Sequence, residues 1–295
     1  MSDQLLDTER TEPRVWICRD REVRVDRTLI MGVLNVTPDS FSDGGQYFDP
    51  ERAVDRALQM EAEGADIIDV GGESTRPGAE PVPVAEELRR VIPVLTRLAG
   101  KVRVLLSVDT YKAQVAAEAL QAGVHIVNDI SGLGFDPEMA PLVARWRAGV
   151  VIMHIKGSPR TMQDHPYYDD VVEEICQYFG GRLRLATEAG ICPEQIVLDP
   201  GIGFGKRVED NFEILRRLGE FRRFGRPVMI GPSRKSFIGK VLGLPPQERL
   251  EGTAAAVAVG IAHGADVVRV HDVREMRRVV QIADCIVGKP GAWRM

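Results

Sequence analysis

The stretch Gly64-Ala65-Asp66-Ile67-Ile68-Asp69-Val70 contains the unit on which the whole sequence is built. A helical pattern ends at the glycine, which adopts the left-handed conformation of a helix C-terminus without steric cost. A short, branched apolar run of the kind found in buried strands follows within a few residues. Residues 264–270, Gly-Ala-Asp-Val-Val-Arg-Val, repeat this order near the other end of the chain. The sequence therefore alternates helices with buried strands.

Eight strands are predicted in this way. Helical patterns end at Gly64, Gly100, Gly123, Gly149, Gly190, Gly225 and Gly264. Together with an earlier apolar run, the segments after these glycines predict strands at residues 29–34, 67–70, 104–108, 126–128, 150–154, 196–199, 228–230 and 267–270. Strands that alternate with helices form right-handed parallel crossovers, and eight such units in roughly 250 residues predict an α/β fold of the (β/α)8 TIM barrel type.

Two short apolar runs precede the first barrel strand, at residues 15–18 and 23–25, and a charged turn separates them. This pattern predicts an N-terminal β-hairpin, which we expect to close one end of the barrel core. The expected organisation is a disordered segment at residues 1–13, a single barrel domain at 14–288 and a C-terminal tail at 289–295.

The composition excludes several classes of protein. The 295 residues are 44% hydrophobic and 27% charged, which is typical of a soluble globular chain with a full core. A net charge of -5 and the absence of a basic stripe argue against a nucleic-acid partner. The four cysteines form no CxxC pair, the polar N-terminus resembles no targeting peptide, and no apolar run is long enough to span a membrane. We therefore expect a cytoplasmic protein with reduced thiols.

Polar or ionisable residues close nearly every predicted strand at its C-terminal end, where barrel enzymes build their active face. In chain order they are Asn35, Glu73, Asp109, Asn128, His154, Asp199, Lys235, Arg269 and His271. Capping alone would place polar residues at some strand ends but not at nearly all of them. The pattern indicates an enzyme rather than a structural or binding module.

These residues fall into two chemical sets. One set combines acceptors with donors and suits the edge of a flat, amide-rich heterocycle; it comprises Asp109, Asn128, Asp199 and Lys235. The other is a donor set that suits phosphate oxygens; it comprises Asn35, Arg269 and His271. No nucleophile with an adjacent base is evident. The predicted chemistry is group transfer with a departing anion and without a covalent enzyme intermediate.

Two loops at the same end of the barrel carry further signals. Residues 231–239, Gly-Pro-Ser-Arg-Lys-Ser-Phe-Ile-Gly, follow the seventh predicted strand and bring two cations and two hydroxyls to the barrel mouth. We expect Arg234 and Lys235 to offer fixed donors to an anion or a planar heterocycle, and Ser233 and Ser236 to add adaptable hydrogen bonds. The glycines at 201–205 lack dinucleotide-binding spacing, and we interpret them as a close approach of backbone to ligand.

Six motifs, at residues 31–45, 69–78, 107–110, 128–132, 198–204 and 231–239, together resemble the dihydropteroate synthase family. Its members join 6-hydroxymethyl-7,8-dihydropterin diphosphate to p-aminobenzoate in folate biosynthesis. The motifs span nearly the whole chain in the family's order and include Asp-Val-Gly-Gly-Glu-Ser-Thr-Arg-Pro-Gly at 69–78. The resemblance implies a pterin-binding barrel over residues 14–288. One departure is Lys156, where the family pattern has a glutamine.

The resemblance also implies roles for individual residues. The pterin would be bound by Asp109, Asn128, Met153, Asp199, Phe204, Gly231 and Lys235. The diphosphate would be bound by Asn35, Arg269 and His271, with a Mg2+ ion beside Asn35, and these three residues with Asp109 and Lys235 would be the catalytic set. The p-aminobenzoate would be bound by Phe41, Thr75, Arg76, Pro77 and Ser236. Family members react by an SN1-like path in which diphosphate leaves first, and they are usually homodimers.

Two other functions share parts of this pattern. A pterin-binding methyltransferase domain of the corrinoid-dependent kind has a similar barrel, and a catalytically idle paralogue would only bind pterins. The loops at residues 36–49 and 72–82 have no apolar period that would dock them on a core, so we expect both to be mobile in the free enzyme. We expect Phe41 and Pro77 to close over p-aminobenzoate only after the pterin diphosphate has bound.

Overall fold

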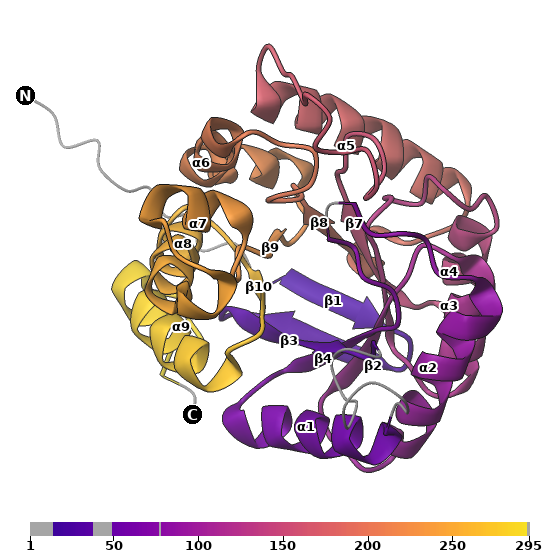
Figure 1. The fold of residues 1–295 in the computed structure, drawn as a ribbon. Coiled ribbons are helices and arrows are strands. Elements are labelled where there is room, and N and C mark those ends of the chain that lie inside the picture. Colours follow the sequence, from indigo (N-terminus) through magenta and orange to yellow (C-terminus); the bar gives the residue numbers. More distant parts are fainter. Residues whose placement is uncertain (1–13, 38–48, 77, 294–295) are drawn as a thin grey trace, which may run out of the picture.

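The computed structural model describes residues 14–37, 49–76 and 78–293. An eight-stranded parallel sheet curves round on itself at its centre, in the order β8-β7-β6-β5-β4-β3-β10-β9, and helices lie outside it (Figure 1). The strands are β3 (Leu29–Asn35), β4 (Ile67–Gly71), β5 (Leu105–Asp109), β6 (Ile126–Asp129), β7 (Gly149–Met153), β8 (Ile196–Asp199), β9 (Met229–Ile230) and β10 (Val267–Val270). The predicted (β/α)8 barrel is confirmed.

The barrel closes between β8 and β9 through a narrow seam. The two segments share one isolated parallel bridge, Leu198 with Val228, and the Leu198 N–H donates to the Pro227 carbonyl at 3.0 Å. Pro227 has no N–H to donate, and the Val228 N–H donates to Asp266 Oδ2 at 3.0 Å instead. This seam explains why β9 has two residues where three were predicted.

The helices begin and end at local signals in the sequence. The Asp170 carboxylate caps α5 by accepting the N–H groups of Val172 and Glu173 at 2.9 and 3.0 Å. Gly64 and Gly264 follow their helices with φ of 98° and 105°, as a left-handed C-terminal residue requires. The helices are α1 (Pro50–Glu63), α2 (Val84–Leu98), α3 (Ala113–Gln121), α4 (Met139–Trp146), α5 (Val171–Glu188), α6 (Val208–Arg216), α7 (Ser236–Leu242), α8 (Leu250–Ala262) and α9 (Val273–Val287).

The prediction that Gly149 ends a helix was wrong. Arg147, with φ of 50°, takes the left-handed position after α4, and Gly149 is the first residue of β7. A Cβ at Gly149 would lie 2.7 Å from Cys18 Sγ and 3.1 Å from Trp16 Nε1. The glycine is therefore needed for space at a tertiary contact and not for backbone conformation.

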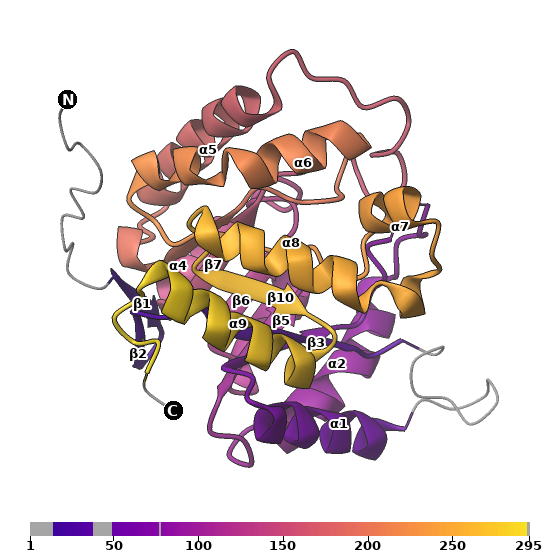
Figure 2. The ribbon, with the colours of Figure 1, turned by 90° about the vertical axis from the view of Figure 1, so that its left-hand side faces the viewer.

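The predicted hairpin closes the N-terminal end of the barrel, which we call the floor (Figure 2). Strands β1 (Arg14–Cys18) and β2 (Arg21–Val25) pair antiparallel. Trp16 is fully buried, and its Nε1 donates to the Gln195 carbonyl at 2.9 Å. The apolar cluster of the floor comprises Trp16, Cys18, Val25, Leu29, Met31, Ile67, Leu105, Ile126, Val151, Val197, Met229 and Val267.

Side chains alternate along each strand between the barrel interior and the helix layer. On β5, Leu105 belongs to the floor cluster, whereas Leu106 and Val108 belong to the core between sheet and helices. Ser107 and Asp109 therefore follow Leu105 into the interior. The same alternation turns Asp69 inward on β4. The C-terminal end of the interior, the mouth, is polar for this reason.

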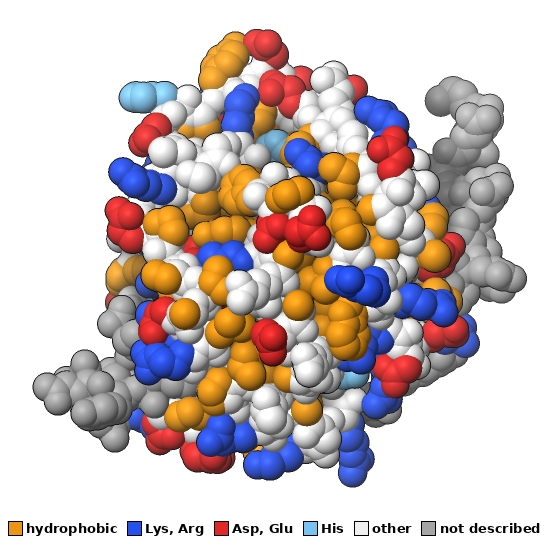
Figure 3. All heavy atoms as spheres, turned by 90° about the vertical axis from the view of Figure 1, so that its right-hand side faces the viewer, with side chains coloured by type: hydrophobic (Ala, Val, Ile, Leu, Met, Phe, Trp, Pro, Cys, Tyr) orange, Lys and Arg blue, Asp and Glu red, His pale blue; other side chains and the backbone are white. Residues whose placement is uncertain are grey.

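The face over α2 to α4 is mixed in charge. Figure 3 shows the face over α2 to α4, where acidic and basic side chains lie among hydrophobic ones and do not gather by sign. Among the described residues, no helix is long and apolar enough to cross a membrane.

Candidate active site

Four strands contribute to a hydrogen-bonded cluster at the barrel mouth. Arg269 on β10 donates from Nε to Asp69 Oδ2 at 2.7 Å and from Nη2 to Asp109 Oδ2 at 2.6 Å. Asn128 on β6 donates from Nδ2 to the same Asp69 oxygen at 2.9 Å. Arg269 was predicted to belong to a separate donor set for phosphate. The structure places its guanidinium among the residues that were predicted to bind the heterocycle.

The mouth contains buried polar atoms without a protein partner. Within the described part of the chain, these atoms are Asp69 Oδ1, Ser107 Oγ and Asp109 Oδ1. Leaving a buried polar group unsatisfied costs about 1–3 kcal/mol. Burial raises the pKa of Asp109 to about 7, although the nearby Arg269 opposes this shift. Unsatisfied oxygens in an interior mouth are suited to accept N–H groups from a ligand.

Asp199 and Lys235 provide an acceptor and a donor on the other side of the mouth. Asp199 Oδ1 accepts the Gly201 N–H at 2.7 Å, and burial raises the pKa of Asp199. Lys235 Nζ donates to the Ile202 carbonyl at 2.6 Å and lies 3.9 Å from the centroid of the Phe204 ring. Burial lowers the pKa of Lys235 to about 7. One described acceptor leaves two ammonium hydrogens for a ligand.

Apolar side chains form a wall beside these polar groups. The wall is a small cluster separate from the main core, and it comprises Ile130, Met153, Ile155, Met162 and Phe204, with Tyr111 packed against it. Met153 and Phe204 were implied to bound the pterin ring. An aromatic heterocycle would find apolar faces here and hydrogen-bonding groups at its edge.

The glycine-rich loop between β8 and α6 passes very close to other atoms. Gly201 and Gly203 have φ of 71° and 81°, and a Cβ at Gly203 would lie 2.6 Å from Lys235 Cδ. A Cβ at Gly201 would lie 1.9 Å from the His154 carbonyl oxygen. The close approach predicted from these glycines is therefore to protein atoms, including the stem of Lys235, and it sets where Lys235 can reach.

Lys206 lies beneath this loop and was missed by the sequence analysis. Its Nζ is 2.9 Å from the Phe204 carbonyl and 3.0 Å from His154 Nδ1, and burial lowers its pKa to about 7. Burial and Lys206 together lower the pKa of His154 well below its usual value. His154 thus supports the loop through Lys206. The signal that could have revealed the pair is the lysine that directly follows the glycine loop.

The predicted phosphate residues lie at the ends of adjacent strands. Asn35 ends β3 opposite Gly71 and is half-buried. His271 Nδ1 is 3.0 Å from Ser233 Oγ, which also accepts the His271 backbone N–H at 3.2 Å. Burial and Arg269 lower the pKa of His271 to about 4, so the ring is neutral at pH 7. With Nδ1 accepting from Ser233, Nε2 carries the proton and is the ring donor.

Arg234, expected to offer donors to a ligand, is paired with a protein carboxylate in the structure. It occupies the left-handed region with φ of 58°, and its guanidinium pairs with Asp272, from Nε to Oδ2 at 3.0 Å. Lys156, the departure from the family pattern, lies 3.3 Å from Glu174 Oε2 and also contacts the Tyr167 carbonyl. Both cations are therefore used in protein contacts at the rim of the barrel.

The residues implied for p-aminobenzoate are only partly described. Ser236 is exposed as the first residue of α7, Thr75 is half-buried and Arg76 is exposed. Phe41 and Pro77 lie outside the described residues. Glu73 is turned away from the mouth cluster and bonds Tyr111 and Lys112.

Comparisons with known proteins agree with this geometry. The sequence model of the pterin binding enzyme family matches residues 31–271. A dihydropteroate synthase of Synechocystis sp. is 50% identical over 261 residues, which cover 88% of this chain and 90% of the relative. A dihydropteroate synthase of Bacillus subtilis is 47% identical over 266 residues, covering 90% and 91%.

Solved structures are similar as well. Yersinia pestis dihydropteroate synthase with a sulfonamide drug complex has a TM-score of 0.88 and 41% identity, covering 93% of this chain and 99% of its own. Xanthomonas albilineans dihydropteroate synthase with 7,8-dihydropteroate has a TM-score of 0.84 and 39% identity, covering 94% and 100%. With this fold, this mouth cluster and these similarities, the chain belongs to the pterin binding enzyme family.

Proposed function

We propose that this protein is a transferase that condenses 6-hydroxymethyl-7,8-dihydropterin diphosphate with p-aminobenzoate to form 7,8-dihydropteroate and diphosphate. The observation that carries the proposal is the unsatisfied buried oxygen Asp109 Oδ1, in one mouth with Asp199 and Lys235. A reduced pterin has ring N–H groups for the oxygens and a carbonyl and ring nitrogen for the ammonium. The complex of the Xanthomonas albilineans relative with 4-aminobenzoic acid supports the same second substrate here.

The pterin is proposed to lie flat against Met153 and Phe204 with its polar edge towards the strand ends. Asp199 and Asp109 accept ring N–H groups. Asn128 and Lys235 form hydrogen bonds with the remaining donors and acceptors along the ring edge. Hydrogen bonds to charged groups contribute about 1.5–3 kcal/mol each. These contacts fix the ring and leave its hydroxymethyl diphosphate arm directed towards Asn35 and His271.

Diphosphate departure is proposed to precede attack by the aryl amine. Arg269, which also bonds Asp69 and Asp109, and the His271 Nε2–H are proposed to donate to the negative charge that grows on the leaving group. Electrostatic stabilisation of this kind often lowers the barrier more than any other effect. The electron-rich reduced pterin stabilises the cation that remains. This SN1-like path needs no covalent enzyme intermediate.

Magnesium is proposed as the metal cofactor. Mg2+ is usually bound through few protein oxygens together with substrate phosphates. The described residues contain no group of three His, Cys, Asp or Glu side chains that could hold an ion alone. The Asn35 amide oxygen at the C-terminal end of β3, with oxygens of the diphosphate, would supply ligands of this kind. When bound, the ion would neutralise charge on the leaving group.

The decisive experiment is mass spectrometry of the product formed from pterin diphosphate, p-aminobenzoate and Mg2+. We expect the mass of dihydropteroate together with released diphosphate, and loss of the signal with EDTA or in Lys235→Met. Binding of pterin without diphosphate release would identify an idle paralogue. Methyl transfer from a methylated pterin to a corrinoid would identify the methyltransferase alternative.

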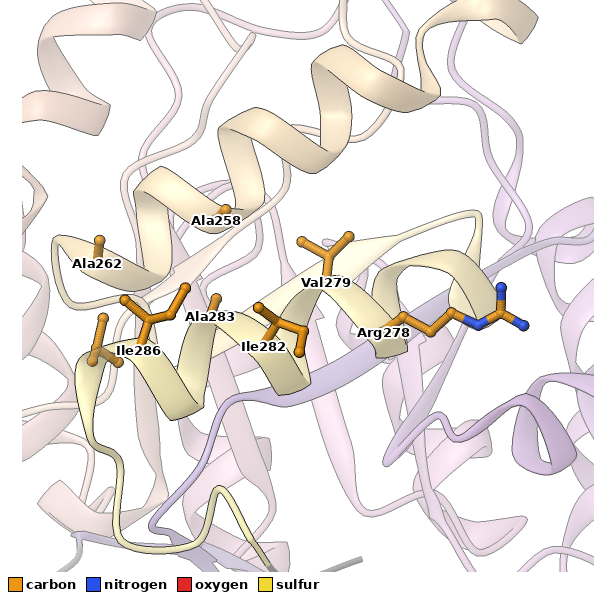
Figure 4. A pocket seen from close by; sticks show the side chains of 8 residues that line it. Ala258, Ala262, Arg278, Val279, Ile282, Ala283 and Ile286 are labelled. Atoms are coloured by element: carbon orange, nitrogen blue, oxygen red, sulfur yellow. The ribbon is translucent and has the colours of Figure 1, made fainter.

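A homodimer is proposed on the face formed by α8 and α9 (Figure 4). Ile282 and Ile286 project there with 63% and 78% of their surface exposed, and the groove is otherwise lined mainly by alanine and valine. Apolar faces of this kind are typical of subunit contacts. Light scattering should show a dimer for the natural chain and a monomer for Ile282→Asp with Ile286→Asp. A cytoplasmic location stays a prediction.

A further inference from the structure

The loop that joins β4 to α2 is closed at its neck by one lysine. Lys112 Nζ donates to Glu73 Oε2 at 2.5 Å and to the Val82 carbonyl at 2.7 Å. It also donates to Glu87 on α2. Glu73 stands two residues after β4 and Val82 two residues before α2. A single ammonium group therefore holds both ends of the loop and the helix that follows it.

Glu73 completes the closure from the other side. Its Oε2 also accepts the Val82 N–H at 2.9 Å, so the backbone of Val82 is bound through both its N–H and its carbonyl. Glu73 and Glu87 are 8% and 1% exposed, which makes this a buried network. Buried hydrogen bonds to charged groups are stronger than those at the surface because the surroundings screen them less.

Tyr111 joins this neck to the apolar wall of the mouth. Its hydroxyl donates to Glu73 Oε1 at 2.7 Å. Its ring packs against the wall cluster and meets the Phe135 ring edge-on at a centroid distance of 5.4 Å. The position of Glu73 is thus set relative to the wall that contains Met153 and Phe204.

The neck limits how far the loop can move. Thr75 follows Glu73 by two residues, so it can lie at most about 7 Å from Glu73 along the chain. The expectation that the whole loop is mobile in the free enzyme does not hold at its base, where Glu73 and Val82 are bound together. The neck therefore fixes both ends of the segment that carries Thr75 and Arg76.

We propose that Glu73 and Lys112 are positioning residues for the second substrate. They hold the loop neck so that Thr75 and Arg76 are presented to p-aminobenzoate, and Tyr111 sets the neck in register with the pterin wall. The proposal rests on the proposed function and on the family resemblance, which implies that Thr75 and Arg76 bind p-aminobenzoate. Neither Glu73 nor Lys112 touches a substrate in this arrangement.

The test compares Glu73→Ala with Glu73→Gln. Alanine removes every contact of the carboxylate but leaves Lys112 paired with Glu87, so no buried charge is left alone. Glutamine can keep its oxygen towards Lys112 and Val82 while its amino group donates to the Tyr111 hydroxyl. We expect Glu73→Ala to raise the KM for p-aminobenzoate about tenfold, with kcat and the calorimetric affinity for pterin within twofold. Glu73→Gln should restore the KM to within threefold.

A second readout does not depend on activity. Hydrogen exchange of the Val82 amide should be protected in the natural chain and in Glu73→Gln, and at least tenfold faster in Glu73→Ala. If Glu73→Ala fails to fold, Tyr111→Phe removes one of the three contacts and should raise the KM for p-aminobenzoate about threefold. Arg97→Ala, which breaks an exposed ion pair between α2 and α1, is the matched control and should change none of these values.

The outcomes separate this proposal from the proposed function. An inactive natural chain with a protected Val82 amide would overturn the proposed function, and with it the role of the neck in presenting p-aminobenzoate. An active chain in which Glu73→Ala weakens both substrates equally, or neither, would overturn the positioning role alone. An unprotected Val82 amide in the natural chain would show that the neck is not closed.

Discussion

The floor and the mouth of the barrel bury polar groups in different ways. At the floor, Gln195 accepts the Trp16 Nε1–H at its carbonyl and donates from Nε2 to the Ala148 carbonyl at 2.7 Å. At the mouth, Asp69 and Asp109 share one arginine and each leaves an oxygen without a protein partner. These polar groups of the floor therefore have protein partners and need no ligand. The mouth keeps unsatisfied groups that a ligand can complete.

The largest expected effect is that of Arg269→Ala, which would leave two buried carboxylates facing each other without a cation. Removing one partner of a buried ion pair costs about 3–5 kcal/mol. Urea unfolding at pH 7 should show a loss of this size, and a smaller loss at pH 5, where a carboxyl can take up a proton. Arg234→Ala, which breaks a partly exposed pair with Asp272, should cost about 1 kcal/mol or less. Equal losses of unfolding free energy in Arg269→Ala and Arg234→Ala would show that the buried carboxylates at the mouth do not depend on Arg269.

Asp199→Asn should reduce affinity without reducing stability. The amide presents a donor where the ligand also has one, and losing a hydrogen bond to a charged group costs about 1.5–3 kcal/mol, or tenfold and more in Kd. Because burial raises the pKa of Asp199, removing its charge should not lower the free energy of unfolding. Titration calorimetry with 6-hydroxymethylpterin measures the first effect and urea unfolding the second. Undiminished affinity would disprove the role of this residue.

Gly149→Ala, at the floor, should reduce stability without reducing pterin affinity. Its Cβ would lie 2.7 Å from Cys18 Sγ, and overpacking of this kind costs about 1–3 kcal/mol. Pterin affinity should stay within twofold. Gly180→Ala in α5 is the control, since its Cβ would meet nothing nearer than 3.9 Å, and it should be neutral or stabilising by about 0.5–1 kcal/mol. A change in affinity in Gly149→Ala would show that the two ends are coupled.

The smallest expected effect is a pH dependence of pterin binding. The pKa of Asp109 is raised to about 7 and that of Lys235 is lowered to about 7. Below this pH Asp109 gains a proton and loses acceptor strength, and above it Lys235 loses a donor and its charge. Affinity should therefore peak near pH 7 and be less than tenfold weaker at pH 6 and at pH 8. Lys235→Met should lose the alkaline fall and keep the acidic one.

The barrel strands could be predicted from the sequence because their signals are local. Glycine after a helix and a branched apolar run are read within a few residues, and most predicted strand ends lie within one residue of the observed ones. Gly149 could not be assigned correctly from such local signals. Its local pattern resembles a helix terminus, but its environment is determined by Trp16 and Cys18, which lie more than a hundred residues away in the chain.

The site was predicted as a set of residues but not as a network. Asp109, Asn128 and Asp199 were found because they end predicted strands, and Lys235 was found because it lies in the loop that follows one. Asp69 was not selected because it lies inside β4, and only the alternation along the strand turns it towards Arg269. The closure of the loop neck joins residues 39 apart in sequence, and no spacing rule indicates such a contact.

The seam between β8 and β9 makes the hydrogen bonding around the barrel uneven. Strands β7 and β8 pair over four positions, whereas β8 and β9 meet at one bridge because Pro227 cannot donate. The loops after these two strands carry Phe204 and Lys235. The two residues proposed to contact the pterin ring from these loops are therefore attached on either side of the single Leu198–Val228 bridge. We expect local opening to begin at this single bridge, because the other neighbouring strands are joined by longer ladders. Substrate entry and native-state exchange of the Leu198 amide should therefore share one opening motion.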